Sequence, residues 1–292
     1  MDGSLLEPGD YQLIGQLSLV AKRRVAGLIT GEQRSPAQSG GIEFADYREY
    51  QPGDDVRRID WAVYLRLRRL LIRLCAEEKE LTLMVILDAS RSMRFGAPEK
   101  LRFAGRLAAI LAGIALQDGN RAGVLAFGSR LHELLRPERG RASLTNVIGA
   151  IARLETAESL DPLACTREFA ARYGRRCMAV FLTDLLFPAW VQAVGGLSAS
   201  GCEAHVIQIL APEELDPPCL GEVTLADLEG RGEVDLHVGW DTARRYHDEL
   251  AGFLREVREV CHRLDLGHAL VTTNRPLDRA LHTELRQEGL LC

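Results

Sequence analysis

Short apolar runs alternate with helical segments from residue 81 onward, and this alternation limits the fold more than any other feature of the chain. Leu81 to Leu87 is rich in apolar and β-branched residues, which is typical of a buried strand. Residues 99–117 carry apolar side chains at helical spacing. Because alternating strands and helices build a mostly parallel sheet covered on both faces, the sequence predicts an α/β fold with a doubly wound sheet.

The later elements continue the same alternation. Strands are predicted over residues 122–127, 131–135, 178–182, 205–210 and 269–272, the second of them as an antiparallel edge strand. Helices are predicted over residues 143–155, 161–174, 189–199, 241–264 and 277–288. Residues 220–238 interrupt the pattern, and their glycine-rich centre predicts a hairpin insertion. In a Rossmann-like strand order of 3-2-1-4-5-6, the first and fourth strands flank the point where the order reverses.

The first 80 residues are organised differently. Residues 10–30 predict an amphipathic helix, and residues 30–41 are polar and glycine-rich, as in a loop. Gln51-Pro52-Gly53-Asp54-Asp55 is a turn signal, and partial alternation over 65–68 and 71–74 predicts strands with one wet face. We therefore divide the chain into an N-terminal extension, residues 1–80, and an α/β domain, residues 81–292.

Composition excludes several classes of protein. The formal net charge of −5 argues against a general nucleic-acid binder, which usually carries a basic excess. Seven scattered cysteines without a Cys-x-x-Cys pair are typical of reduced thiols in a cytosol. The N-terminus lacks a signal-peptide pattern, and the longest apolar and glycine stretch, residues 107–116, is too short to span a bilayer. We expect a soluble, cytoplasmic protein.

Polar residues follow two of the predicted strands. Asp88-Ala89-Ser90-Arg91-Ser92 comes directly after the first strand, and Asp184 closely follows the fourth. If these strands flank the switch point, Asp88 and Asp184 lie side by side. Carboxylate and hydroxyl oxygens suit a hard cation such as Mg²⁺, and few carboxylates leave it able to attract one from outside. The alternative is that Ser90 or Ser92 simply caps a helix.

This loop resembles the metal-ion-dependent adhesion site of von Willebrand factor type A domains. Those domains add a threonine from a later loop and an aspartate after the fourth strand. Leu144-Thr145-Asn146-Val147 is similar to the threonine loop, and Thr183-Asp184 is similar to the aspartate segment. The resemblance implies a bound Mg²⁺, or Mn²⁺ or Ca²⁺, held by Asp88, Ser90, Ser92, Thr145 and Asp184, with Ser143 as an alternative to Thr145.

A longer motif precedes the α/β domain. It runs from Arg48-Glu49-Tyr50 through Pro52-Gly53-Asp54-Asp55 to Ile59-Asp60-Trp61. It resembles the bacterial domain-of-unknown-function fifty-eight family, and the resemblance covers roughly residues 40 to 290. Members of that family are typically encoded beside MoxR-type AAA+ ATPases. The resemblance therefore implies an adaptor or co-chaperone whose partner is such an ATPase or its client.

Two charged segments allow alternative interpretations. Mixed charges at Asp54, Asp55, Arg57, Arg58 and Asp60 either form local ion pairs that hold the turn or offer a docking surface for a partner. The arginines at positions 66, 68, 69 and 73 either pair with the glutamates at 77, 78 and 80 on a solvated face or bind phosphate. The net acidity of the chain favours the solvated face.

Two functions remain. The first is a non-enzymatic, metal-dependent protein-interaction module that docks a partner carboxylate on a divalent ion. The second is a metal-dependent hydrolase of a phosphorylated substrate, suggested by a metal site at a switch point. The sequence has no Gly-x-Ser-x-Gly, His-Glu-x-x-His or phosphate-loop motif. A haloacid-dehalogenase-like phosphatase needs an aspartate where Ser90 stands, so we favour the module and expect no enzymatic activity.

Overall fold

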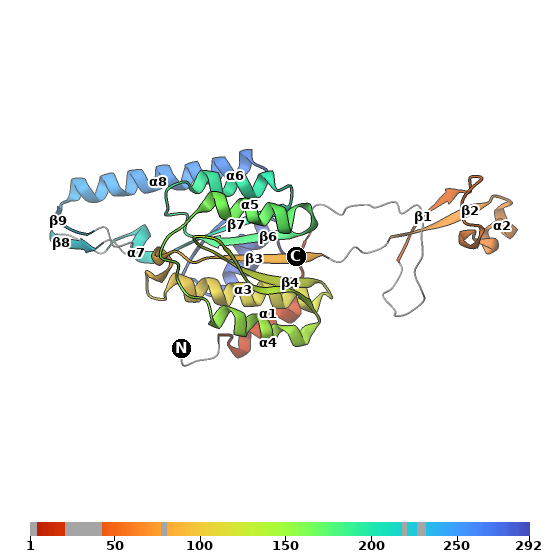
Figure 1. The fold of residues 1–292 in the computed structure, drawn as a ribbon, viewed down its shortest axis with the longest axis horizontal. Coiled ribbons are helices and arrows are strands. Elements are labelled where there is room, and N and C mark those ends of the chain that lie inside the picture. The colour runs from red at the N-terminus through yellow and green to blue at the C-terminus, as the bar shows by residue number, and fades with distance from the viewer. Residues whose placement is uncertain (1–4, 21–42, 77–80, 218–220, 227–231) are drawn as a thin grey trace. The chain divides into compact units, whose positions relative to one another are not determined.

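The computed structural model describes residues 5–20, 43–76, 81–217, 221–226 and 232–292. The chain forms two compact units, one from residues 1–22 and 81–292 and the other from residues 23–80, and Figure 1 labels their elements. The predicted extension over residues 1–80 differs from this division. Helix α1 (Pro8–Gln16) belongs to the α/β unit, because its apolar side packs on that unit's core.

Six strands form the sheet of the α/β unit, in the order β10-β7-β6-β3-β4-β5. If these six strands are numbered 1 to 6 in chain order, the order read from β5 to β10 is 3-2-1-4-5-6, as predicted. Only β5 runs antiparallel, paired with β4, as predicted. The strands are β3 (Thr82–Asp88), β4 (Arg121–Phe127), β5 (Leu131–Arg139), β6 (Met178–Thr183), β7 (Glu203–Leu210) and β10 (Gly267–Thr272).

Helices cover both faces of this sheet (Figure 1). One hydrophobic cluster holds α1, α3 (Lys100–Gln117) and α4 (Leu144–Ala152), and the other holds α5 (Pro162–Arg172), α6 (Trp190–Ala199) and α8 (Trp240–Arg263). Strand β3 is buried on both sides, since its residues are almost all apolar. The prediction of a doubly wound α/β fold is confirmed.

The hairpin predicted over residues 220–238 is also confirmed. Strands β8 (Gly221–Ala226) and β9 (Glu233–Val238) pair antiparallel and follow the short helix α7 (Pro212–Leu215). Most of its glycine-rich centre, residues 227–231, lies outside the described residues. Among the described residues, no helix is both long enough and apolar enough to cross a membrane.

Both ends of the α/β unit differ in detail from prediction. Helix α1 stops at Gln16 because Leu17 takes an extended backbone, and Leu19 then bridges to Leu291. Residues 21–30 of the predicted helix lie outside the described residues. The final helix is α9 (Leu277–Arg279) followed by a π-helical turn, η5 (Ala280–Leu285). Short 3₁₀ turns complete the unit: η2 (Arg91–Arg94), η3 (Arg141–Ser143) and η4 (Gly174–Arg176).

The second unit contains the long motif. Strands β1 (Glu43–Glu49) and β2 (Leu71–Ala76) pair antiparallel, with η1 (Val56–Arg58) and α2 (Trp61–Leu67) between them. The prediction of a strand over residues 65–68 is wrong. The Asp60 side chain accepts hydrogen bonds from two backbone N–H groups of the first turn and so starts a helix there, and Arg68, at φ 55°, ends it.

The predicted turn in this unit is held by a local ion pair. Arg48 contacts Asp54 at 2.9 Å, and the other oxygen of Asp54 accepts a hydrogen bond from the backbone N–H of Gln51. Gly53 has φ 111°, which favours glycine. These contacts support local pairing at Asp54. The glutamates expected to pair with the arginine cluster lie outside the described residues, and Arg69 instead pairs with Glu49.

Candidate metal site

Strands β3 and β6 end side by side, and each carries an aspartate at its carboxyl end. The two strands pair in parallel, with Leu87 opposite Leu182. Asp88 is the last residue of β3, and Asp184 follows the last residue of β6. Both side chains are fully buried. The structure thus brings these two predicted site residues together at the switch point.

Both oxygens of the Asp88 carboxylate accept hydrogen bonds. The backbone N–H of Ser90 donates to Oδ1 at 2.8 Å, and the hydroxyl of Thr183 donates to Oδ2 at 2.6 Å. Burial, and then the nearby charge of Asp184, raise the pKa of Asp88 to about 7. The local environment therefore disfavours the ionised form of Asp88 beside Asp184, and a bound cation would favour that form.

Ser90 and Ser92 add two hydroxyls to this loop. Their Oγ atoms lie 2.9 Å apart. Ser90 stands at the N-cap of η2 but its side chain makes no capping hydrogen bond, and Ser92 lies inside that turn. The helix-capping alternative therefore lacks support at Ser90. Asp88, Ser90, Ser92 and Asp184 are the four predicted site residues that gather here.

The structure does not bring Thr145 to this site. Strand β5 runs antiparallel and returns the chain to the opposite edge of the sheet, where Arg139 pairs with Arg121 and Arg121 pairs with Thr82. Thr145 follows in the first turn of α4 and is exposed. Ser143, the alternative, donates a hydrogen bond to the backbone oxygen of Arg139 at that same far edge. A strand of seven residues, about 23 Å long, separates the two edges.

Thr156 is a residue that sequence reasoning missed. The backbone N–H of the next residue, Ala157, donates a 2.7 Å hydrogen bond to the backbone oxygen of Ala89. This bond holds the segment after α4 against the metal loop. The sequence signal was a threonine in a polar stretch between two helices, hidden because the predicted helix over 143–155 ended too late. Thr156 itself is half-buried.

Lys100 is the second residue that sequence reasoning missed. Its Nζ atom lies 2.7 Å from Oδ2 of Asp184, and it also pairs with Oε1 of Glu214 on α7. The lysine side chain is fully buried at the start of α3. The other Asp184 oxygen accepts a 2.9 Å hydrogen bond from the backbone N–H of Leu186. One signal was available: this chain uses arginine almost everywhere, and Lys100 is one of three lysines.

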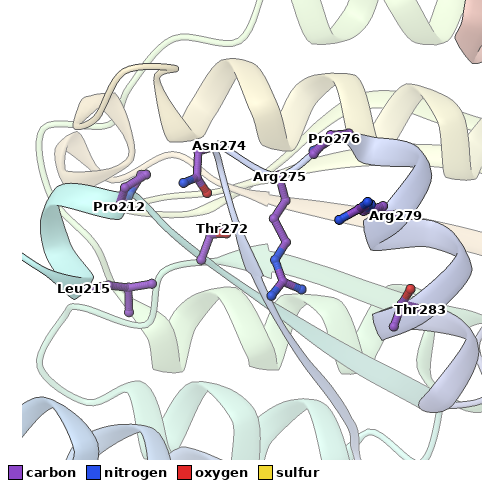
Figure 2. A pocket seen from close by; sticks show the side chains of 8 residues that line it. All are labelled: Pro212, Leu215, Thr272, Asn274, Arg275, Pro276, Arg279 and Thr283. Atoms are coloured by element: carbon purple, nitrogen blue, oxygen red, sulfur yellow. The ribbon is translucent and has the colours of Figure 1, made fainter.

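Helix α7 also forms part of a neighbouring cavity of about 690 Å³ (Figure 2). This cavity lies by the carboxyl ends of β7 and β10. In it, Arg275 pairs with Glu284. The lining residues are Pro212, Leu215, Thr272, Asn274, Arg275, Pro276, Arg279 and Thr283. Helix α7 therefore contacts both the cavity and, through Glu214, the buried lysine.

The donor atoms at the switch point partly fit a divalent ion. Two buried carboxylates and two adjacent hydroxyls are oxygen ligands of the kind that Mg²⁺ prefers. The described residues contain no group of three or more histidine, cysteine, aspartate or glutamate side chains placed to hold a metal. A site here would therefore depend on hydroxyls and on few carboxylates, one of which already pairs with Lys100.

Two solved structures are similar to the chain at low identity. A conserved hypothetical protein BatB from Bacteroides thetaiotaomicron has a TM-score of 0.44 and 14% identity, covering 71% of this chain and 98% of that one. A von Willebrand factor type A protein from Catenulispora acidiphila has a TM-score of 0.40 and 14% identity, covering 75% of this chain and 43% of that one.

Two relatives are similar over most of the sequence. Uncharacterized proteins of Mycobacterium tuberculosis and Mycobacterium bovis are each 30% identical over 233 residues, which is 78% of this chain and 73% of the relative. The family model described as protein of unknown function DUF58 matches residues 46–255, a range that includes residues 46–80 of the second unit and the candidate metal site. The predicted resemblance is confirmed, and the chain belongs to this family.

Proposed function

We propose that the protein is a non-enzymatic, metal-dependent interaction module that docks a carboxylate of a protein partner on a divalent ion. The observation that carries this proposal is the burial of Asp88 and Asp184 together, beside the paired hydroxyls of Ser90 and Ser92. These four residues would hold Mg²⁺, or Mn²⁺ or Ca²⁺. We assign to Thr156 the metal-ligand role first expected of Thr145, since the backbone N–H of the next residue, Ala157, donates a hydrogen bond to Ala89 in the metal loop.

The local charge supports docking rather than a closed structural site. The site holds two carboxylates, those of Asp88 and Asp184, and the ammonium of Lys100 pairs with one of them. A divalent ion held here would keep excess positive charge and would offer an open coordination position to an oxygen of the partner. The pKa of Asp88, raised to about 7 by burial and by Asp184, supports the need for a cation.

The class of partner follows from family resemblance. The family association implies a MoxR-type AAA+ ATPase or a client of such an ATPase, and we propose an adaptor or co-chaperone role in the cytoplasm. A chaperone partner with an exposed acidic residue at its docking surface fits the charge of the proposed site.

Calorimetric titration with Mg²⁺ and Mn²⁺ tests the metal part of the proposal. We expect binding to the wild-type protein, loss of binding in Asp88→Ala and weaker binding in Ser92→Ala. Glu249→Ala is the control, because Glu249 is an exposed acid on α8, outside the site. Wild-type binding no stronger than that of Asp88→Ala would refute the proposal.

A pull-down tests the partner. The full chain is used as bait with and without EDTA, and with Asp88→Ala in parallel. We expect one set of proteins to depend on both the metal and Asp88. The hydrolase alternative predicts instead a metal-dependent turnover on a panel of phosphate esters, lost in Asp88→Ala.

A further inference from the structure

The ammonium of Lys100 lies against Asp184, one of the carboxylates that would hold the divalent ion. We infer that the Lys100 ammonium is a tethered counter-ion that competes with the divalent ion for Asp184, and that Glu214 sets the strength of this competition. This inference rests on the proposed function, because it concerns the same site. It assigns Lys100 and Glu214 as residues that determine metal affinity.

The burial of Lys100 separates this contact from an ordinary ion pair. The side chains of Lys100 and Asp184 are both fully buried, and their 2.7 Å contact excludes solvent. A buried charge is costly unless it is paired, and removing one partner leaves the other uncompensated. Lys100 meets this requirement with two carboxylates, those of Asp184 and Glu214.

Each oxygen of Asp184 already accepts one partner in this arrangement. Oδ2 faces Lys100, and Oδ1 accepts the backbone N–H of Leu186. An ion that contacts Oδ2 of Asp184 would therefore share that oxygen with the ammonium or displace it. Two like charges held a few ångströms apart in a buried site repel each other strongly. We expect removal of the ammonium to strengthen metal binding at least about tenfold.

Glu214 should have the opposite effect on metal affinity, because it draws the Lys100 ammonium away from Asp184. Its Oε1 pairs with Lys100, while its Oε2 accepts a 2.7 Å hydrogen bond from the backbone N–H of Ala211. The backbone oxygen of Glu214 accepts a hydrogen bond from the Tyr246 hydroxyl, which ties α7 to α8. Without the Glu214 charge, the ammonium has Asp184 as its remaining partner. The ammonium should then bind Asp184 more strongly and weaken metal binding.

The experiment measures Mn²⁺ and Mg²⁺ affinity of the full chain by calorimetry at pH 8. The variants are Lys100→Met, Glu214→Gln and Arg102→Met, and circular dichroism checks the folding of each. Arg102 is exposed on the same helix, so its loss removes the same formal charge outside the site. We expect tighter binding in Lys100→Met by at least about tenfold, weaker binding in Glu214→Gln and no change in Arg102→Met.

The opposite signs distinguish competition from a merely structural role, which predicts weaker binding in both site variants. Wild-type binding with no gain in Lys100→Met overturns the inference and leaves the proposed function in place. If Lys100→Met fails to fold, Glu214→Gln decides, and affinity equal to or above wild type overturns the inference. Binding by Lys100→Met alone supports the inference but refutes a metal-dependent role of the natural protein. Binding by neither protein refutes both.

Discussion

The hydroxyl of Thr183 donates a 2.6 Å hydrogen bond to Oδ2 of Asp88 and so joins the ends of β6 and β3. The same hydroxyl oxygen accepts a 2.9 Å hydrogen bond from the backbone N–H of Leu185. Leu185 has φ 59°, a conformation that costs energy in a residue with a side chain. Thr183 therefore stabilises both the Asp88 carboxylate and the strained turn that follows β6.

Thr183→Val removes this hydroxyl while keeping the shape of the side chain. Two buried polar groups, the Asp88 carboxylate and the Leu185 N–H, then lose a partner. We expect a loss of about 1–3 kcal/mol in the free energy of unfolding. Urea unfolding at pH 8 measures it, with Thr183→Ser as the control that keeps the hydroxyl. Equal stability of the valine and serine variants would contradict this account.

Asp88→Asn should change how stability depends on pH. The pKa of Asp88 in the folded protein is about 7, above the ordinary value of 3.8, because burial and Asp184 disfavour its charge. As pH rises from about 4 to about 7, the unfolded chain gives up this proton first, so the folded state loses stability. Above pH 7 the cost is on the order of 4 kcal/mol. Asparagine carries no such cost.

In EDTA, the asparagine variant should therefore gain stability relative to wild type between pH 4.5 and pH 8, and added Mg²⁺ should reduce its advantage. Urea unfolding across this range, with Glu249→Gln on α8 as an exposed control, provides the measurement. A difference between variant and wild type that stays flat with pH would show that Asp88 is not the group responsible.

Arg106→Met should release α1 from the α/β unit. Arg106 on α3 donates to both oxygens of Asp10 at 2.8 and 2.9 Å, and Asp10 is buried. If α1 stays docked without the guanidinium, the buried carboxylate of Asp10 has lost its charged partner, which costs about 3–5 kcal/mol. Hydrogen exchange should show lost protection over residues 8–16 and retained protection in β3. Arg102→Met is the control, and unchanged protection of α1 in Arg106→Met would count against the prediction.

Two adjacent glycines of α6 should respond oppositely to alanine. A Cβ at Gly196 would lie 2.5 Å from the side chain of Thr166 on α5, whereas a Cβ at Gly195 meets no atom within 4 Å. Gly196→Ala should destabilise the protein by about 1–3 kcal/mol through overpacking. Gly195→Ala should be neutral or stabilise by up to about 1 kcal/mol, because alanine favours a helix. Thermal unfolding compares them, and similar melting temperatures would argue against the close α5–α6 contact.

Local patterns were enough to predict most of the α/β unit. Strand β3 is a short apolar run and α3 has apolar residues at helical spacing, and both formed within a residue or two of the predicted bounds. The strand order then placed Asp88 beside Asp184, because parallel neighbours end at the same edge. The errors occurred where a single side chain outweighs a pattern. Asp60 starts a helix where partial alternation suggested a strand.

The sequence by itself determined the family and the fold class, since each depends on local periodicity or on a contiguous motif. The strand order typical of that fold class then predicted that Asp88 lies beside Asp184. Only the tertiary structure decided that Thr145 lies at the far edge of the sheet, that the segment of Thr156 reaches the metal loop, and that Lys100 lies against Asp184. Lys100 is 84 residues from Asp184 and 114 residues from Glu214. No local pattern encodes such contacts, because they arise only when packing removes the three charges from water together.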